Sequence, residues 1–402
     1  MTRPQLKIAF VVPRYGAQVR GGAESAVRML ATRLASCDDT TVEILTTTAV
    51  DMNTWENYFP SGNEIEDNVT IRRFRVDSGR ISNFEAATAK MLSSARSRTL
   101  DEAKHFVELQ GPVSGSLIDA IARSNADAVV FYPYLYHSTT EGVLSCQAFT
   151  ILHPAAHEES ALDLPIYDEV FSSVDALVYQ TAAERDVVET RFKVSDKPSL
   201  LLGMGIDSYA ISSSDILTRL GLGSKPFLLC LGRVDVAKGT TLLVQLFKEF
   251  KVRNNIDLKL VIAGPISDLP PSHPDVILVG PVSDAEKDSL LSAMLVLVSP
   301  SLYESFSIVL LEAWDKKKPV LVNKACAATT EQVIRSGGGL YFSNYETFEL
   351  SLEKFLGDID LRKRLGENGH KFGRAFYSWD SLILKYREFI CSRLAWRSSK
   401  PL

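Results

Sequence analysis

Cysteine is scarce in this sequence of 402 residues, and its five occurrences form no pattern. They are odd in number and widely separated, without the paired spacing typical of a zinc site or a disulfide framework. We therefore expect reduced thiols in a cytoplasmic protein and no metal centre. The five positions are Cys37, Cys146, Cys230, Cys326 and Cys391.

Long hydrophobic runs are also missing. The longest, such as residues 227–231 and 295–298, have the length of a strand, far below the ~20 residues that span a bilayer. The first residues lead into a strand-like segment, without the apolar core of a secretory leader. The formal net charge is −5, so no broad basic field favours nucleic acid as a partner. These absences predict a cytoplasmic protein that does not bind nucleic acid.

What is present is an alternation of strands and helices, which predicts parallel, doubly wound sheets. Apolar, β-branched runs read as buried strands. A first series lies at residues 8–12, 42–46, 128–132, 149–153, 176–179 and 199–202. A second series lies at residues 227–231, 259–263, 276–278, 295–298 and 319–322. Helical spacing is clearest at residues 23–34, 241–251, 308–314 and 381–396.

A turn-rich segment separates the two series and predicts a hinge between two domains. Its glycines and polar residues lie at 203–207, 212–215 and 221–224. We expect an N-terminal Rossmann-like domain over residues 1–205, a C-terminal one over residues 206–375, and a last helix, 376–402, packed back on the first. Ligands bind at the carboxyl ends of parallel strands, so this α/β fold predicts a site in a central cleft between the domains.

The most informative loop follows the strand at 227–231 and carries Arg233 and Lys238. Two cations between a strand end and a helix start suit a diphosphate, whose charge grows as it leaves. Solvated surface charges are the simpler interpretation of any Arg and Lys pair. The position directly after a buried strand favours phosphate binding.

A second loop, after the strand at 295–298, carries Glu304 and leads into a helix with Glu312. Carboxylates accept hydrogen bonds from sugar and ribose hydroxyls. The N–H groups of Phe306, Ser307 and Ile308 come at the start of that helix, where they are free to bind an anion. A first-turn charge and a helix ion pair would explain the two glutamates without a ligand.

Two weaker signals lie in the N-terminal half. Gly21 and Gly22 open the first helix and permit a close approach of backbone to ligand, although such pairs often only make a turn. This is not the G-x-G-x-x-G of a dinucleotide-binding dehydrogenase. His153 ends a strand and points to the same predicted cleft, although a single histidine there is more often structural.

Taken together, these pieces resemble the retaining GT-B glycosyltransferase family that includes sucrose synthase and bacterial mannosyl- and glucosyltransferases. The resemblance rests on order and spacing over almost the whole chain. It implies a hexosyltransferase that needs no metal and no cofactor, with a nucleotide diphosphate sugar as co-substrate. The leaving phosphate would accept the proton of the attacking hydroxyl.

The resemblance also assigns roles. Arg233 and Lys238 would hold the diphosphate and Glu312 the ribose. Glu304 would bind the transferred sugar, with the amides of Phe306, Ser307 and Ile308 gripping phosphate or sugar. Gly21 and Gly22 would face the donor phosphate, and His153 the donor sugar. Thus Glu304, His153, Arg233 and Lys238 are the expected catalytic residues.

The sequence departs from the family at several positions. Ser305 and Ser307 stand where the family often has glycine, and Pro154 follows His153, so His157 or Glu158 would share the histidine's role. Asp358 and Asp360 have the spacing of the metal-binding D-x-D motif of other glycosyltransferases. They lie at the start of a predicted helix, where helix capping explains them better than metal binding.

The acceptor is expected to be a glycan or lipid-linked glycan of bacterial cell-surface polysaccharide synthesis. Basic residues over 72–104 suggest a peripheral contact with the inner face of the membrane, although a solvated helix face explains them as well. Two alternatives remain open. One is a sugar-nucleotide 2-epimerase on the same fold, and the other is a non-catalytic sugar-nucleotide-binding protein.

Overall fold

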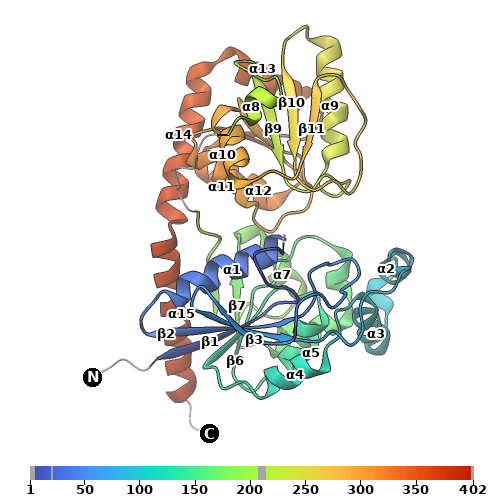
Figure 1. Ribbon diagram of the computed structural model, residues 1–402, viewed down its shortest axis with the longest axis vertical. Coiled ribbons are helices and arrows are strands. Elements are labelled where there is room, and N and C mark those ends of the chain that lie inside the picture. The colour runs from blue at the N-terminus through green and yellow to red at the C-terminus, as the bar shows by residue number, and fades with distance from the viewer. Residues whose placement is uncertain (1–4, 20, 207–213, 400–402) are drawn as a thin grey trace. The chain divides into compact units, whose positions relative to one another are not determined.

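The computed structural model describes residues 5–19, 21–206 and 214–399. The chain forms two compact units (Figure 1). Unit 1 combines the residues up to Gly203 with those from Leu382 onward, and unit 2 is Met204–Ser381. Residues 207–213 of the predicted hinge and Arg20 of the first glycine loop lie outside the described residues.

Unit 1 is built on an eight-stranded sheet of order β3-β4-β2-β1-β5-β6-β7-β8. Neighbouring strands are parallel, except that β3 and β4 form an antiparallel pair. The strands are β1 (Leu6–Val11), β2 (Thr40–Thr47), β3 (Gly62–Glu66), β4 (Val69–Phe74), β5 (Ala128–Phe131), β6 (Phe149–Leu152), β7 (Ala176–Tyr179) and β8 (Ser199–Leu201).

Helices cover both faces of this sheet, with α1 on the side opposite α4 and α5 (Figure 1). On the latter side, Phe106, Ile121 and Phe171 share one core with Val11 and Phe131 of the strands. The helices are α1 (Gly22–Ala35), α2 (Phe84–Leu92), α3 (Leu100–Gln110), α4 (Gly115–Ala122), α5 (His137–Ser145), α6 (Pro165–Ser173), α7 (Ala182–Arg191) and α15 (Trp379–Ser399).

Unit 2 has a six-stranded, wholly parallel sheet of order β11-β10-β9-β12-β13-β14. The order reverses direction at β9 and β12, which is where doubly wound sheets bind ligands. The strands are β9 (Phe227–Leu231), β10 (Lys259–Ala263), β11 (Val276–Gly280), β12 (Val296–Ser299), β13 (Val320–Asn323) and β14 (Gly339–Phe342).

Two helices, α9 and α13, bury Phe247, Phe250, Phe348 and Phe355 on one face of this sheet, in a core with Leu228. Helices α10, α11 and α12 lie on the other side (Figure 1). The helices of unit 2 are α8 (Ile216–Arg219), α9 (Thr240–Arg253), α10 (Asp284–Ala293), α11 (Ile308–Asp315), α12 (Ala327–Ser336), α13 (Tyr345–Gly357) and α14 (Ile359–Phe376).

The predicted buried strands are all present, with ends that shift by one or two residues. The β3–β4 hairpin and β14 were not predicted, because β3 is largely exposed and β14 is only half-buried. The side chain of Asp358 accepts a hydrogen bond from the Leu361 N–H at 2.8 Å, which confirms that the D-x-D imitation caps α14. Within the described ranges, no helix is both long and apolar enough to cross a membrane.

Candidate functional site

The candidate site in unit 2 lies where two neighbouring strands end. Strand β9 pairs in parallel with β12, so the loops that follow them leave the same edge of the sheet. The first loop, residues 232–239, leads into α9, and the second, residues 300–307, leads into α11. This places the predicted cations and the predicted carboxylate of two distant segments side by side.

Lys238 and Glu304 form the central contact of this site. Their Nζ and Oε1 atoms are 2.7 Å apart, and both side chains are partly exposed, by 30% and 17%. The loops also touch through their backbones. Gly239 has a φ of +75°, and a Cβ there would lie 2.6 Å from the carbonyl oxygen of Pro300. Only glycine permits this close approach, which brings Lys238 beside Glu304.

Asp235 organises the first loop. Its side chain accepts the backbone N–H of Lys238 at 2.7 Å and forms an ion pair with Arg233, at 3.0 Å between Oδ2 and Nε. Asp235 is almost buried, whereas the Arg233 side chain is 47% exposed. Arg233 is therefore tethered at the loop but accessible to an anion.

Helix α11 begins at the second loop with a conformation that is unusual for a residue with a side chain. Ser307 has a φ of +73° and a ψ of 80°, in the left-handed region that costs L-residues about 1–2 kcal/mol. Phe306 is buried, and its carbonyl accepts a hydrogen bond from the Gln332 side chain. The N–H groups of Ser307 and Ile308 have no hydrogen-bond partner in the part of the chain that the structure describes. Such N–H groups at a helix start can bind an anion.

Glu312 lies further along α11 and contacts α10 instead of the Lys238–Glu304 pair. Its Oε1 is 2.8 Å from Nζ of Lys287. Burial by itself lowers the pKa of Lys287, but the Glu312 carboxylate reverses this effect, so that the pKa is raised. The carboxylate of Glu312 is thus fixed by a cation that the sequence did not single out.

The charges of Lys238 and Glu304 also affect the pKa of the Cys230 thiol, in β9. Burial raises its pKa to about 12, with Lys238 acting against this shift and Glu304 adding to it. Both charged groups therefore act on the buried end of β9, the strand after which the first loop begins.

Comparison with known proteins now identifies the chain. Residues 219–372, which include both loops, match the family model described as "Glycosyl transferases group 1". The chain is a glycosyltransferase, and its group 1 match lies within unit 2. It is 26% identical over 296 residues to the alpha-D-kanosaminyltransferase of Streptomyces kanamyceticus, a match that covers 65% of this chain and 74% of that protein.

Two further comparisons support the glycosyltransferase family and its fold. The capsular polysaccharide biosynthesis glycosyltransferase CapM of Staphylococcus aureus is 28% identical over 175 residues, which are 40% of this chain and 45% of CapM. The crystal structure of Anabaena HepE in complex with UDP and glucose aligns with a TM-score of 0.67 at 12% identity, over 96% of this chain and 100% of that chain. The glycosyltransferase thus has the GT-B fold that the sequence predicted.

Unit 1 of the glycosyltransferase places its glycine pair at the start of α1. Gly22 is exposed, and a Cβ there would meet nothing within 4 Å. At Gly21 a Cβ would lie 2.0 Å from a carboxylate oxygen of Glu24. Gly21 therefore leaves room for the buried Arg14–Glu24 ion pair, which has an Nη2–Oε1 distance of 2.6 Å. The approach of Gly22 to a donor phosphate stays a prediction.

His153 lies inside unit 1, with 2% of its surface exposed. Its Nε2 is 2.9 Å from the hydroxyl of Tyr386 in α15, and burial lowers its pKa to about 3. This imidazole is neutral near pH 7 and its Nε2 is already engaged. These contacts fit the structural interpretation of His153, whereas its role toward the donor sugar stays a prediction.

A buried carboxylate that the sequence analysis missed lies close to the same strand end. Glu184, in α7, accepts the backbone N–H groups of Ala156 and Gln180, and burial raises its pKa to about 8. The Gln180 side chain donates in turn to the hydroxyl of Tyr132. No motif marks Glu184, because its hydrogen bonds come from backbone N–H groups of two separate segments.

The remaining predicted residues of unit 1 contact charged side chains of the same unit. Glu158 pairs with Arg191 at 2.5 Å, and His157 lies 3.4 Å from Glu159. Five cations of the basic stretch also have carboxylate partners, and a membrane contact through this stretch stays a prediction. These pairs are Arg72–Glu43, Arg73–Glu64, Arg96–Asp163, Arg98–Glu102 and Lys104–Glu169.

Proposed function

We propose that this glycosyltransferase moves a hexose from a nucleotide diphosphate sugar to a glycan or lipid-linked glycan, with retention of anomeric configuration and without a metal ion. The observation that carries the proposal is the 2.7 Å contact between Lys238 and Glu304, with Arg233 on the same loop. This contact places a cation for the leaving phosphate beside a carboxylate for the sugar, at the carboxyl ends of β9 and β12.

The ion pair suggests how the donor is received. When a diphosphate enters, its negative charge competes with Glu304 for the ammonium group of Lys238. The Glu304 carboxylate is then free to accept hydrogen bonds from the hydroxyls of the transferred sugar. Arg233, half-exposed beside Asp235, adds a second fixed charge on the diphosphate.

The proposed chemistry follows from this placement. As the bond between the anomeric carbon and the phosphate oxygen breaks, its electron pair and the negative charge pass to the diphosphate. Lys238, Arg233 and the free N–H groups that open α11 stabilise that charge without reorganising. The oxygen of the acceptor hydroxyl forms the new bond to the anomeric carbon and transfers its proton to the departing phosphate oxygen. Because the new bond forms on the face from which the diphosphate leaves, the configuration is retained.

Glu312 is proposed to bind the ribose hydroxyls, with Lys287 holding its carboxylate in place. The complex of HepE with UDP and glucose supports a nucleotide diphosphate sugar as the donor class. The name of the kanosaminyltransferase supports transfer of a sugar, and the name of CapM supports a place in polysaccharide synthesis. A peripheral membrane contact at a lipid-linked acceptor belongs to the same proposal.

A thermal-shift screen over nucleotide diphosphate sugars tests the donor first, because a ligand that binds only the folded state raises the melting temperature. The donor that gives a shift is then incubated with candidate acceptors. Nucleotide diphosphate release that requires an acceptor supports transfer, whereas epimerised donor without an acceptor contradicts it. The anomeric configuration of the product, read by NMR, tests retention, and activity in excess EDTA tests independence from metal.

A further inference from the structure

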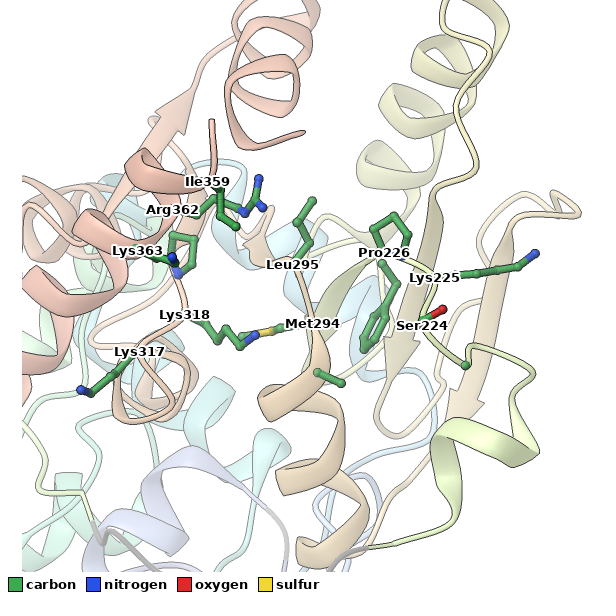
Figure 2. Close-up of a pocket in the computed structure, with 14 residues that line it drawn as sticks. Ser224, Lys225, Pro226, Met294, Leu295, Lys317, Lys318, Ile359, Arg362 and Lys363 are labelled. Atoms are coloured by element: carbon green, nitrogen blue, oxygen red, sulfur yellow. The ribbon is translucent and has the colours of Figure 1, made fainter. Parts of the chain in front are cut away.

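A second cationic site lies at the amino-terminal ends of the strands of unit 2, opposite the strand ends that carry the candidate donor site. A pocket of about 340 Å³, here called the basic pocket, is lined by fourteen residues (Figure 2). They come from the segments that precede β9, β12 and β13 and from the first turns of α14. The candidate donor site follows β9 and β12. Because β9 has five residues at ~3.3 Å each, the two sites are separated by roughly 15 Å of sheet.

The charge of this pocket is of one sign. Its lining includes five cationic side chains and no carboxylate. The cations are Lys225, Lys317, Lys318, Arg362 and Lys363. Pocket volumes of this size hold small ligands, and cations arranged around a concavity select anions.

Three of the cations are available to a ligand. Among the described residues, no carboxylate pairs with Lys318 or Lys363. Arg362 directs Nη1 at the carbonyls of Phe355 and Leu356, which fixes the guanidinium but does not neutralise it. Figure 2 shows Lys318 extending across the pocket toward Met294, while Lys317 and Lys225 point away on either side.

The environment of Lys318 is unusual for a cation without a partner. Burial lowers its pKa, and the neighbouring positive charge of Arg362 lowers it further. A bound anion would remove that repulsion, so both charges favour anion binding. The two outer lysines pair only with exposed carboxylates, Lys225 with Asp257 and Lys317 with Glu367. Such exposed pairs are weak and leave these lysines able to turn to a ligand.

We propose that the basic pocket binds a phosphate-bearing ligand, with Lys318, Arg362 and Lys363 contacting the phosphate. The apolar part of the lining, which includes Pro226, Leu295 and the exposed side chain of Ile359, contacts the body of the ligand. The phosphate comes either from a soluble phosphate ester or from a lipid headgroup. This site is separate from the proposed donor site and does not depend on the proposed transfer reaction.

The first arm of the test titrates inorganic phosphate into the full chain by calorimetry, at constant ionic strength. The pocket variant is Lys318→Gln with Lys363→Gln. The matched control, Lys354→Gln with Lys371→Gln, removes the same charge from exposed positions of unit 2 outside the pocket. We expect the pocket variant to raise the Kd for phosphate about tenfold or more, and the control to leave it within about twofold.

A third variant, Lys238→Gln, separates the two sites. Unchanged phosphate affinity in this variant supports the basic pocket. If phosphate affinity falls in Lys238→Gln but not in the pocket variant, or if the wild-type chain does not bind phosphate, the proposal is overturned. Neither result bears on sugar transfer, which is read separately with donor and acceptor.

The second arm identifies the source of the phosphate. Vesicles of phosphatidylcholine with and without phosphatidic acid are sedimented with the wild-type chain and both double variants. Sedimentation that requires phosphatidic acid and intact pocket lysines supports a lipid headgroup. Binding of inorganic phosphate without pocket-dependent sedimentation supports a soluble ester. Sedimentation that is equal in all three proteins, together with no phosphate binding, overturns the proposal.

Discussion

Lys238 and Glu304 stand 66 positions apart in the chain, yet their Nζ and Oε1 atoms meet at 2.7 Å. The contact exists because β9 and β12 are neighbours in the sheet and their loops leave the same edge. It defines a site in which one charge of each sign is available and neither is fully buried.

Replacement of Lys238 by glutamine tests the stabilisation of the leaving diphosphate. We expect kcat/KM to fall by about 10²–10³-fold, because one preorganised positive charge is lost where negative charge develops. The side chain is partly exposed, so the melting temperature should change little. Lys354→Gln, on the exposed face of α13, is the control for loss of a positive charge. Equal turnover in both variants would remove Lys238 from the site.

The Lys287–Glu312 pair allows a test of ribose binding. In Lys287→Met the carboxylate of Glu312 loses the cation that fixes it. We expect the KM for the donor to rise several-fold with kcat little changed, because ribose contacts bind ground state and transition state alike. Lys316→Met is a matched control, since Lys316 pairs with Asp288 of α10 at 2.6 Å and leaves Glu312 intact. A fall in kcat alone would contradict a ribose role.

Gly239 tests the close approach of the two loops. An alanine there meets the Pro300 carbonyl oxygen at 2.6 Å, in addition to a left-handed backbone with φ of +75°. Gly221→Ala is the control, because Gly221 has a φ of +62° and open space around it. We expect Gly221→Ala to cost about 1–2 kcal/mol from backbone strain. Gly239→Ala should cost more and also lower turnover. Calorimetric melting of both variants measures the difference, and equal losses would show that the contact is unimportant.

His153 predicts a pH dependence of stability in unit 1. Its pKa is about 3 in the folded state against about 6.5 in an unfolded chain, so the unfolded state binds the proton first as pH falls. The stabilising contribution of the neutral imidazole is complete above pH 6.5 and is lost progressively toward pH 3. Between pH 7 and pH 5 the loss is about 2 kcal/mol.

Hydrogen exchange of peptides that cover β6 measures this loss. The variant His153→Gln keeps a polar partner for Tyr386 and does not titrate, so its stability should change less between pH 7 and pH 5 than that of the wild-type chain. His105→Gln, at an exposed position of α3, should behave like the wild-type chain. Identical pH dependence in wild type and His153→Gln would refute the prediction.

Much of the fold could be predicted from local pattern. Buried parallel strands are continuous apolar runs, and such runs marked every strand up to β13 except β3 and β4. Strand β14 was missed because Tyr341 and its neighbours leave it half-exposed, and the β3–β4 hairpin because β3 is largely exposed and β4 buries only alternate side chains. A continuous apolar run indicates a fully buried strand, so partly exposed strands are missed even though backbone pairing places them in the sheet.

For the site, the sequence determined which loops carry charge and where they begin, since Arg233, Lys238 and Glu304 lie in loops that follow predicted strands. Only the tertiary structure decided the partners. In the folded chain Lys238 contacts Glu304, and Glu312 contacts Lys287. His153 is buried and contacts the hydroxyl of Tyr386. The reason is that strand order in a sheet and the packing of a distant helix are set by long-range contacts, which no local spacing of residues encodes.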